Sequence, residues 1–221
     1  MAENEIKKKV LTYRPDIFEV NDLESAMGVI LTPELGTTTQ ERWEYETPYL
    51  VDEIGRALEL DDESCVLDYG CGIGRIAKGL IERYNCFVIG IDISTSMRQL
   101  ALGYVKSDRF AVCAPATLER MTVGGFRVTH AYACWVIQHC LAPLVDLARI
   151  DSALASDGRL FVLNSNHRCV PTDRGWANDG ISIEELLTAR FEKIAKGDLP
   201  EVITTPEIAN SSYTMTLRKR S

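Results

Sequence analysis

The sequence predicts a doubly wound α/β domain whose sheet is mostly parallel. From residue 65 onward, short apolar runs alternate with segments whose apolar residues recur at helical spacing. Strand–helix–strand units of this kind build a parallel sheet with helices on both faces. A glycine-rich stretch, VLDYGCGIGR at 66–75, stands where the first strand meets the first helix, and sheets of this type bind ligands at such junctions.

Composition narrows the class of protein further. The chain has 221 residues, 46% hydrophobic and 25% charged, which is typical of one globular domain with a full core. The net charge of -8 argues against a nucleic-acid partner, because binding to phosphates normally requires a basic face. No apolar run reaches the roughly 20 residues of a membrane span, and the start MAENEIKKKV lacks the apolar core of a secretory signal. We therefore expect a cytoplasmic protein with no membrane partner.

The seven cysteines indicate reduced thiols. They are scattered, none forms a CxxC pair, and several lie in apolar runs. Such cysteines usually serve as small core residues in a reducing compartment. We expect no metal site.

The first 60 residues are expected to form a helical lid segment ahead of a domain that occupies 61–221. Thr38 and Glu41 have the spacing of a capping box at the start of a helix. Apolar residues follow at helical spacing as far as about residue 60. Pro48 is expected to break or kink this helix.

The elements of the domain follow from the alternating pattern. Strands are expected at 65–69, 86–92, 109–114, 126–135 and 158–166. Helices are expected at 74–84, 94–105, 117–121, 143–155 and 181–191. Ser94 and Ser182 are the expected caps of two of these helices. Two late strands near 191–195 and 213–219 are expected to close the chain.

The three alternating glycines indicate a bound cofactor. A helix start offers free N–H groups, and Gly70, Gly72 and Gly74 would let a ligand approach them. The dinucleotide pattern GxGxxG, counted from Gly70, would need a glycine where Arg75 stands. Asp68 would repel a pyrophosphate, whereas it would attract a sulfonium ligand with an ammonium group. The spacing thus favours S-adenosylmethionine over a dinucleotide.

These residues resemble the first motif, D/E-x-G-x-G-x-G, of class I S-adenosylmethionine-dependent methyltransferases. Asp92 resembles the acidic residue after the second strand, and ACWVIQH at 133–139 resembles the turn after the fourth. LASDGRLFVLN at 154–164 resembles the approach to the fifth strand, so the likeness runs from about residue 40 to the end. It implies a Rossmann-like seven-stranded sheet with a C-terminal antiparallel strand, S-adenosylmethionine as cofactor, and in-line methyl transfer.

The resemblance also implies which residues bind the cofactor. Asp92 would accept hydrogen bonds from both ribose hydroxyls. Ala114 and Pro115 stand where many members carry an acidic residue near the adenine amino group, which is a departure from the family. The full expected set is Arg42, Asp68, Gly70, Gly72, Gly74, Asp92, Ile93, Met97, Ala114 and Trp135.

The acceptor side depends on the turn after the fourth strand and the loop after the fifth. His139 is the candidate catalytic base, since histidine titrates near neutral pH, although it could instead cap the loop. The polar stretch 164–180 is expected to overhang the acceptor, with a solvated connection as the alternative. Candidate substrate contacts are Trp135, Asn164, Asn166, His167 and Trp176.

The predicted function is methylation of a small-molecule acceptor at oxygen or nitrogen. The D/N-PP-Y/F motif of nucleic-acid and glutamine methylation does not follow the fourth strand. Two alternatives are a catalytically silent subunit that binds the cofactor and an NAD(P)-dependent oxidoreductase, which Asp68 disfavours. The sequence indicates no particular oligomeric state.

Overall fold

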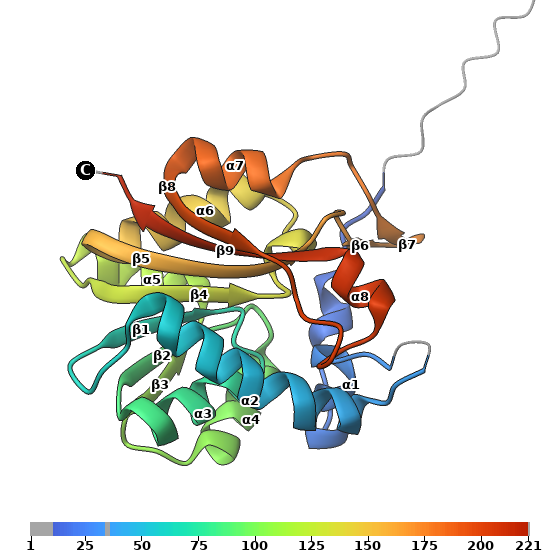
Figure 1. Cartoon of the computed structure of the whole chain (residues 1–221), viewed down its shortest axis with the longest axis horizontal. Coiled ribbons are helices and arrows are strands. Elements are labelled where there is room, and N and C mark those ends of the chain that lie inside the picture. The colour runs from blue at the N-terminus through green and yellow to red at the C-terminus, as the bar shows by residue number, and fades with distance from the viewer. Residues whose placement is uncertain (1–10, 34–35, 221) are drawn as a thin grey trace, which may run out of the picture.

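A seven-stranded sheet forms the centre of the molecule, in the strand order β3-β2-β1-β4-β5-β9-β8 (Figure 1). The structure, a computed structural model, describes residues 11–33 and 36–220. The strands are β1 (Cys65–Tyr69), β2 (Phe87–Ile91), β3 (Phe110–Cys113), β4 (Val128–Cys134), β5 (Leu154–Ser165), β8 (Phe191–Gly197) and β9 (Ser212–Lys219). β9 runs antiparallel to both of its neighbours, and the first five strands are parallel to one another. The predicted fold class is therefore confirmed.

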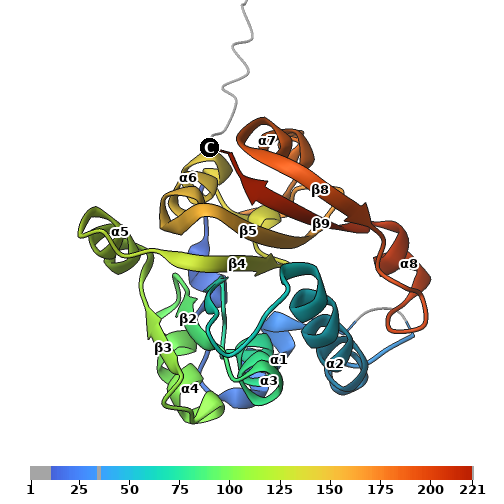
Figure 2. The same cartoon turned by 60° about the vertical axis from the view of Figure 1, so that its left-hand side comes forward.

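Helices cover both faces of the sheet (Figures 1 and 2). The α-helices are α1 (Leu23–Ile30), α2 (Thr39–Leu58), α3 (Arg75–Tyr84), α4 (Thr95–Val105), α5 (Pro115–Val123), α6 (Pro143–Ala153), α7 (Ile183–Arg190) and α8 (Pro206–Asn210). Two 3₁₀ turns, η1 (Pro15–Phe18) and η2 (Ile137–His139), complete the helical elements. Helices α2, α3 and α4 share one apolar cluster with the sheet, and α5, α6 and α7 share another.

The alternation of side chains along the strands explains these two clusters. On β1, Val66 faces the α2–α4 cluster and Leu67 faces the α5–α7 cluster, and both are fully buried. Leu67 is in register with Ile89 of β2 and Ala131 of β4, which belong to the same cluster. A strand that is buried on both faces reads as a continuous apolar run, as CVLDY does.

The expected caps form, but Pro48 does not break α2. Thr38 and Glu41 make the predicted capping box, and Ser94 and Ser182 accept hydrogen bonds from the first turns of α4 and α7. Helix α2 continues through Pro48 without a break. One lost hydrogen bond is a small penalty for a helix whose next turns are buried in the α2–α4 cluster.

A group of short elements, for which the sequence predicted no exact positions, gathers at the carboxyl ends of the parallel strands, on the right of Figure 1. It comprises α1, α8 and a hairpin of β6 (Val170–Thr172) and β7 (Gly175–Ala177). The segment before η1 joins the hairpin, because Tyr13 bridges Thr172 and the Arg14 N–H donates to the Pro171 carbonyl. In the described part of the chain, no helix is both long and apolar enough to cross a membrane.

Candidate active site

A large cavity opens where the parallel strands end. Its volume of about 990 Å³ is at the upper end of the range for ligand pockets, roughly 300–1,000 Å³. Its lining comes from the turns after β1, β2 and β4, and from the segment 13–30 and the β6–β7 hairpin. It is the place at which doubly wound sheets bind ligands.

Two of the three glycines form one wall of this cavity. Gly70 and Gly72 line it with φ angles of 80° and 52°, a region that favours glycine. Gly74 also has a positive φ, 79°, but it does not line the cavity. A Cβ atom on Gly74 would lie 2.5 Å from Val105 of α4. Gly74 therefore allows close packing of helices, and its expected role at the cofactor stays a prediction.

Asp92 joins the two loops that border the cavity. Its Oδ2 atom accepts a hydrogen bond from the Gly72 N–H at 2.8 Å, and its Oδ1 accepts one from the Ser94 N–H at 2.8 Å. Burial raises the pKa of this carboxyl, while the two N–H donors counteract the shift. Each carboxylate oxygen has a second lone pair. Asp92 can thus hold its loops and accept from a ligand at the same time.

Asp68 lies directly beneath the glycine turn and is only 4% exposed. Burial raises its pKa to about 7, and the nearby Asp92 adds to the shift while Arg75 opposes it. Asp68 is not part of the cavity wall, although its neighbours Tyr69 and Gly70 are. A cation bound at this turn would favour the ionised form of Asp68.

Two buried arginines line the other end of the glycine turn. Arg42 donates from Nε to Glu46 at 2.6 Å and from Nη1 to the Thr32 carbonyl at 2.9 Å. Arg75 donates from Nη1 to Thr47 at 3.0 Å, and its Nε has no hydrogen-bond partner among the described residues. Desolvation lowers the pKa of Arg75. A buried guanidinium with an unused donor is suited to a carboxylate ligand.

Arg75 was not among the expected cofactor-binding residues. The signal was its position directly after the third glycine, at the first residue of α3. The side chain also lies over the Trp43 ring, with 5.4 Å from Cζ to the ring centroid. Its position is therefore held from two sides.

Apolar side chains line the part of the cavity beyond Asp92. Ile93, Met97 and Pro115 contribute to this wall. Ala114, which was expected there, precedes the wall as the N-cap of α5 and does not line the cavity. The residue of this stretch that lines the cavity is therefore Pro115 and not Ala114, and the wall is apolar as expected.

The site residues fit S-adenosylmethionine. Arg42 and Arg75 suit its carboxylate, Asp92 suits its ribose hydroxyls, and the apolar wall suits its adenine. Asp68, which does not line the cavity, would attract its ammonium through its charge. Both Gly70 and Gly72 present main chain rather than side chains to this region.

The turn after β4 forms the opposite wall. Trp135 lines the cavity with a φ of 61°, an uncommon value for a bulky residue, and the turn is held by its N–H, which donates to the Leu163 carbonyl at 2.8 Å. The indole Nε1 has no partner among the described residues. Trp135 therefore has the expected position.

His139 lies on the same turn and has one defined tautomer. Its Nδ1 is 2.7 Å from the Cys169 carbonyl, so Nδ1 carries the proton that it donates. Its Nε2 is 3.4 Å from the Gln138 amide nitrogen, and the Gln138 oxygen accepts from the Ser165 N–H. This arrangement leaves the lone pair on Nε2. Burial is the main reason why the pKa of His139 is lowered, so the ring is neutral at pH 7.

Two further aromatic rings accompany His139. The ring centroid of Trp176 is 5.1 Å from that of His139, and Phe18 lies 5.8 Å from His139 and 6.5 Å from Trp176. We call these three rings the aromatic wall, and all three line the cavity. Trp176 was predicted here. Phe18 was not, because nothing local in the sequence places residue 18 beside residue 139.

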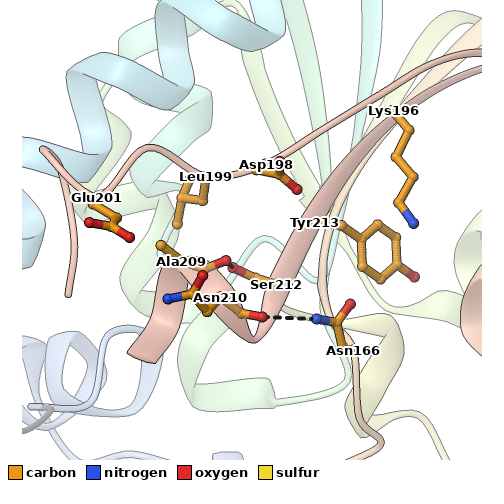
Figure 3. Close-up of a pocket in the computed structure, with 9 residues that line it drawn as sticks. All are labelled: Asn166, Lys196, Asp198, Leu199, Glu201, Ala209, Asn210, Ser212 and Tyr213. Carbon is orange, nitrogen blue, oxygen red and sulfur yellow. Dashed lines mark hydrogen bonds between the residues drawn. The ribbon is translucent and has the colours of Figure 1, made fainter. Parts of the chain in front are cut away.

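Three other predicted substrate contacts do not reach the cavity. Asn164 is fully buried, accepts from the Gln138 N–H and donates to the Ser165 carbonyl, so it stabilises the turn. His167 is exposed and lies outside the cavity wall. Asn166 faces a separate, smaller cavity of about 440 Å³, where it donates to the Asn210 carbonyl at 3.3 Å (Figure 3).

Comparison with protein families gives a match that covers most of the chain. A family model described as "Methyltransferase domain" matches residues 42–203. No curated protein matches the sequence.

Several solved structures share the fold. The chain is similar to an N-methyltransferase, NodS, from Bradyrhizobium japonicum with S-adenosyl-L-homocysteine, at 13% identity and a TM-score of 0.61, over 80% of this chain and 88% of that one. It is similar to the 1,6-didemethyltoxoflavin-N1-methyltransferase of Burkholderia thailandensis at 21% identity and a TM-score of 0.60, over 79% and 78%. A putative sarcosine dimethylglycine methyltransferase from Galdieria sulphuraria has 11% identity and a TM-score of 0.62, over 83% and 87%. At these identities the likeness shows a common fold.

Proposed function

This chain belongs to the methyltransferase-domain family and is an S-adenosylmethionine-dependent methyltransferase, and from that premise we propose that it methylates a small-molecule acceptor at oxygen or nitrogen. The observation that carries the proposal is the geometry of one cavity. Residues suited to the cofactor line one half of it, and His139 with the aromatic wall lines the other half. The volume of about 990 Å³ leaves room for a second small molecule beside a cofactor.

The cofactor supplies an activated methyl group on a sulfonium sulfur. The residues of the chain then have to position the acceptor and exclude water, which can lower the barrier by about 7–11 kcal/mol. Tyr13, Phe18 and Val29 line the cavity from the segment ahead of residue 61. We propose that this segment serves as a lid. The division into a lid, 1–60, and a domain, 61–221, remains a prediction.

Glu19 supports the lid proposal because it ties this segment to the domain. Its carboxylate accepts from the Thr95 N–H at 2.9 Å and the Ser96 N–H at 3.0 Å, both in the first turn of α4. These bonds, led by the one from the Ser96 hydroxyl, lower the pKa of Glu19 to about 2. A carboxylate at a helix start also interacts favourably with the helix dipole. The contact holds the segment over the cavity.

His139 is the proposed general base for an acceptor that holds its proton at neutral pH. Its Nε2 lone pair is unprotonated, and the Cys169 carbonyl holds the ring in place through Nδ1. A base positioned in this way contributes about 10²- to 10⁴-fold to a rate. The amide of Gln138, 3.4 Å from Nε2, can stay with the imidazole until an acceptor replaces it.

The two carboxylates under the glycine turn argue against an oxidoreductase. A dinucleotide would place its pyrophosphate at Gly70 and Gly72, near Asp68 and Asp92, which are coupled electrostatically. Repulsion between a pyrophosphate and these nearby carboxylates would be costly in a buried site. The cavity therefore does not favour an NAD(P)-dependent oxidoreductase.

Calorimetric titration with S-adenosylhomocysteine, beside a titration with NADH, tests the proposal. We expect S-adenosylhomocysteine to bind with a micromolar dissociation constant and NADH to show no heat of binding. Incubation of the protein with S-adenosylmethionine and a library of small molecules should then give methylated products by mass spectrometry. NADH binding, or no binding of S-adenosylhomocysteine, would contradict the assignment of the cavity. Tight binding without any methylated product would favour the silent-subunit alternative.

A further inference from the structure

We infer that the acceptor is a planar aromatic molecule with an ionisable hydroxyl, which lies against the aromatic wall with its oxygen at His139. The inference rests on the proposed function, because it places an acceptor in the half of the cavity that the cofactor does not use. Three observations carry it: the aromatic wall, the tautomer of His139, and the distribution of charge around them.

The aromatic wall is made of residues that no core packing requires. Trp176 belongs to the short hairpin and is 57% exposed, yet its ring is 5.1 Å from His139 and 6.5 Å from Phe18. The three rings come from η1, η2 and β7, which are far apart in the chain. Nearby apolar side chains, Ile17, Leu141 and Val145, extend the same surface and are themselves exposed. Rings of a ligand pack favourably on a surface of this kind.

The charges around His139 disfavour a cationic acceptor. Arg168 is buried beneath η2, where its Nη1 donates to the Ile137 carbonyl at 2.9 Å. Its charge opposes protonation of His139. Asp179 pairs with Arg168 from the exposed side. A developing oxyanion near His139 is stabilised by this charge, and an ammonium group is repelled by it.

The carboxylate at this end of the described cavity wall is already paired with an arginine. Of the cavity-lining residues that the structure describes, two carry a carboxylate, Asp92 and Asp146. Asp92 belongs to the cofactor half. Asp146 accepts from the Tyr69 hydroxyl at 2.6 Å and from Arg149 at 2.9 Å. The acceptor half is therefore apolar and aromatic with a positive charge behind it, which suits a neutral molecule that loses a proton.

The chemistry of such an acceptor balances without any further reactant. The hydroxyl proton moves to Nε2 of His139, and the electron pair left on the oxygen forms the bond to the methyl carbon. The bond between that carbon and sulfur breaks, and its electron pair stays on sulfur, which becomes a neutral thioether. The proton on His139 then passes to solvent. Nδ1 keeps its proton toward Cys169 throughout.

The test uses three naphthalene-sized probes on protein saturated with S-adenosylhomocysteine. The probes are 2-naphthol, the saturated analogue decahydro-2-naphthol, and 1-naphthylmethylamine, which is a cation at neutral pH. We expect 2-naphthol to bind about tenfold or more tightly than either of the others in calorimetry. With S-adenosylmethionine in place of S-adenosylhomocysteine, mass spectrometry should detect 2-methoxynaphthalene.

Substitutions of Trp176 test whether its ring causes the preference for an aromatic probe. Trp176→Ala should remove most of the preference for 2-naphthol over decahydro-2-naphthol, and Trp176→Phe should retain it. Tyr45→Ala is the matched control, because Tyr45 is an aromatic residue of α2 that is 60% exposed and lies outside the cavity wall. The affinity of each variant for S-adenosylhomocysteine reports whether it is folded.

The outcomes separate the two proposals. If S-adenosylhomocysteine binds but the three probes bind equally, or none of them binds, the inference about the acceptor is overturned and the proposed function is not. Tighter binding of the amine would overturn it in favour of a cationic acceptor. Failure of S-adenosylhomocysteine to bind the native protein would instead contradict the proposed function itself.

Discussion

The two halves of the cavity are built in different ways. The cofactor half is almost continuous in sequence, since Asp68, Gly70, Gly72, Arg75 and Asp92 come from two adjacent strand–helix junctions. The acceptor half is assembled from three distant stretches, 13–18, 137–142 and 169–176. Main-chain hydrogen bonds between neighbouring turns position the first half. Side-chain packing between remote segments positions the second.

This difference has a consequence for function. Backbone conformation imposes the geometry of a site made of adjacent turns, so such a site remains specific for one ligand. A site made of a hairpin, a 3₁₀ turn and a leading segment can change its shape by substitution without disturbing the sheet. We expect substitutions in the first half to weaken cofactor binding, and those in the second half to alter turnover while the cofactor still binds.

The largest effect is expected for Asp92→Ala. The substitution removes two hydrogen bonds of 2.8 Å that join the loops, from the N–H groups of Gly72 and Ser94. It also removes the proposed acceptor of the two ribose hydroxyls. Each hydrogen bond to a charged group is worth about 1.5–3 kcal/mol, so affinity for S-adenosylhomocysteine should fall about 10²- to 10⁴-fold. Calorimetric titration measures the change. Asp157→Ala, at an exposed position of β5 outside the cavity wall, is the control, and unchanged affinity in Asp92→Ala would show that the cofactor half is not built around this carboxylate.

His139→Gln probes the acceptor half and should lower turnover about 100-fold, because the general base is lost. Affinity for S-adenosylhomocysteine should stay within about twofold, since the substitution leaves the cofactor half intact. Turnover is measured with the acceptor found in the screen described above. A parallel loss of cofactor affinity would mean that the two halves are not independent.

The pH dependence of the native protein sharpens the role of His139. Burial and the charge of Arg168 lower its pKa below the ordinary value of 6.5, while the hydrogen bond to Cys169 acts in the opposite direction. The neutral, basic form is therefore present at pH 7, and turnover should decline only as the pH falls below 6.5. This decline should be absent from the residual activity of His139→Gln.

The smallest effect is expected for Asp68→Asn, which should weaken S-adenosylhomocysteine binding about tenfold by removing the counter-charge of the ammonium group. The same change should stabilise the free protein at pH 8. The pKa of Asp68 is raised from 3.8 to about 7 in the fold, chiefly by burial, with Asp92 acting in the same direction and Tyr132 and Arg75 against it. Stability from this group is present below pH 3.8 and is lost as the pH rises through 7.

Denaturant titrations at pH 5 and pH 8 test whether the stability contributed by Asp68 falls as the pH rises. The free energy of unfolding of the native protein should decrease between these values relative to that of Asp68→Asn. S-adenosylhomocysteine should bind the native protein more tightly at pH 8 than at pH 5, because binding favours the ionised carboxyl. A pH-independent difference in stability between the two proteins would contradict the raised pKa.

The fold and the cofactor half were largely predictable from sequence, for physical reasons that operate over short distances. Apolar runs of strand length and helical periodicity are local, and Ser94, Thr38 and Glu41 are local capping signals. The turn at Gly70 and Gly72 is local as well. Even here, Gly74 and Ala114 were expected at the cavity and do not line it, whereas Arg75 lines it and was not expected. Which residues reach the cavity depends on what packs against each of them.

The acceptor half was not predictable in the same way. Trp135, His139 and Trp176 were expected at the cavity and line it, while Asn164, Asn166 and His167 do not. The loop after β5 reads as a polar connection in sequence, and its return as a hairpin depends on partners near residue 13. Those partners decide which side chains of the hairpin face the cavity.

The sequence by itself determined the parallel sheet, the order of its helices and the ligand-binding turn after β1, because period, capping and backbone conformation act between residues that are close in the chain. Only the tertiary structure decided that Phe18, His139 and Trp176 meet, that Arg168 lies behind them, and that Asp68 has a raised pKa. Proximity across more than a hundred residues and the loss of water around a carboxyl exist only after the chain has folded.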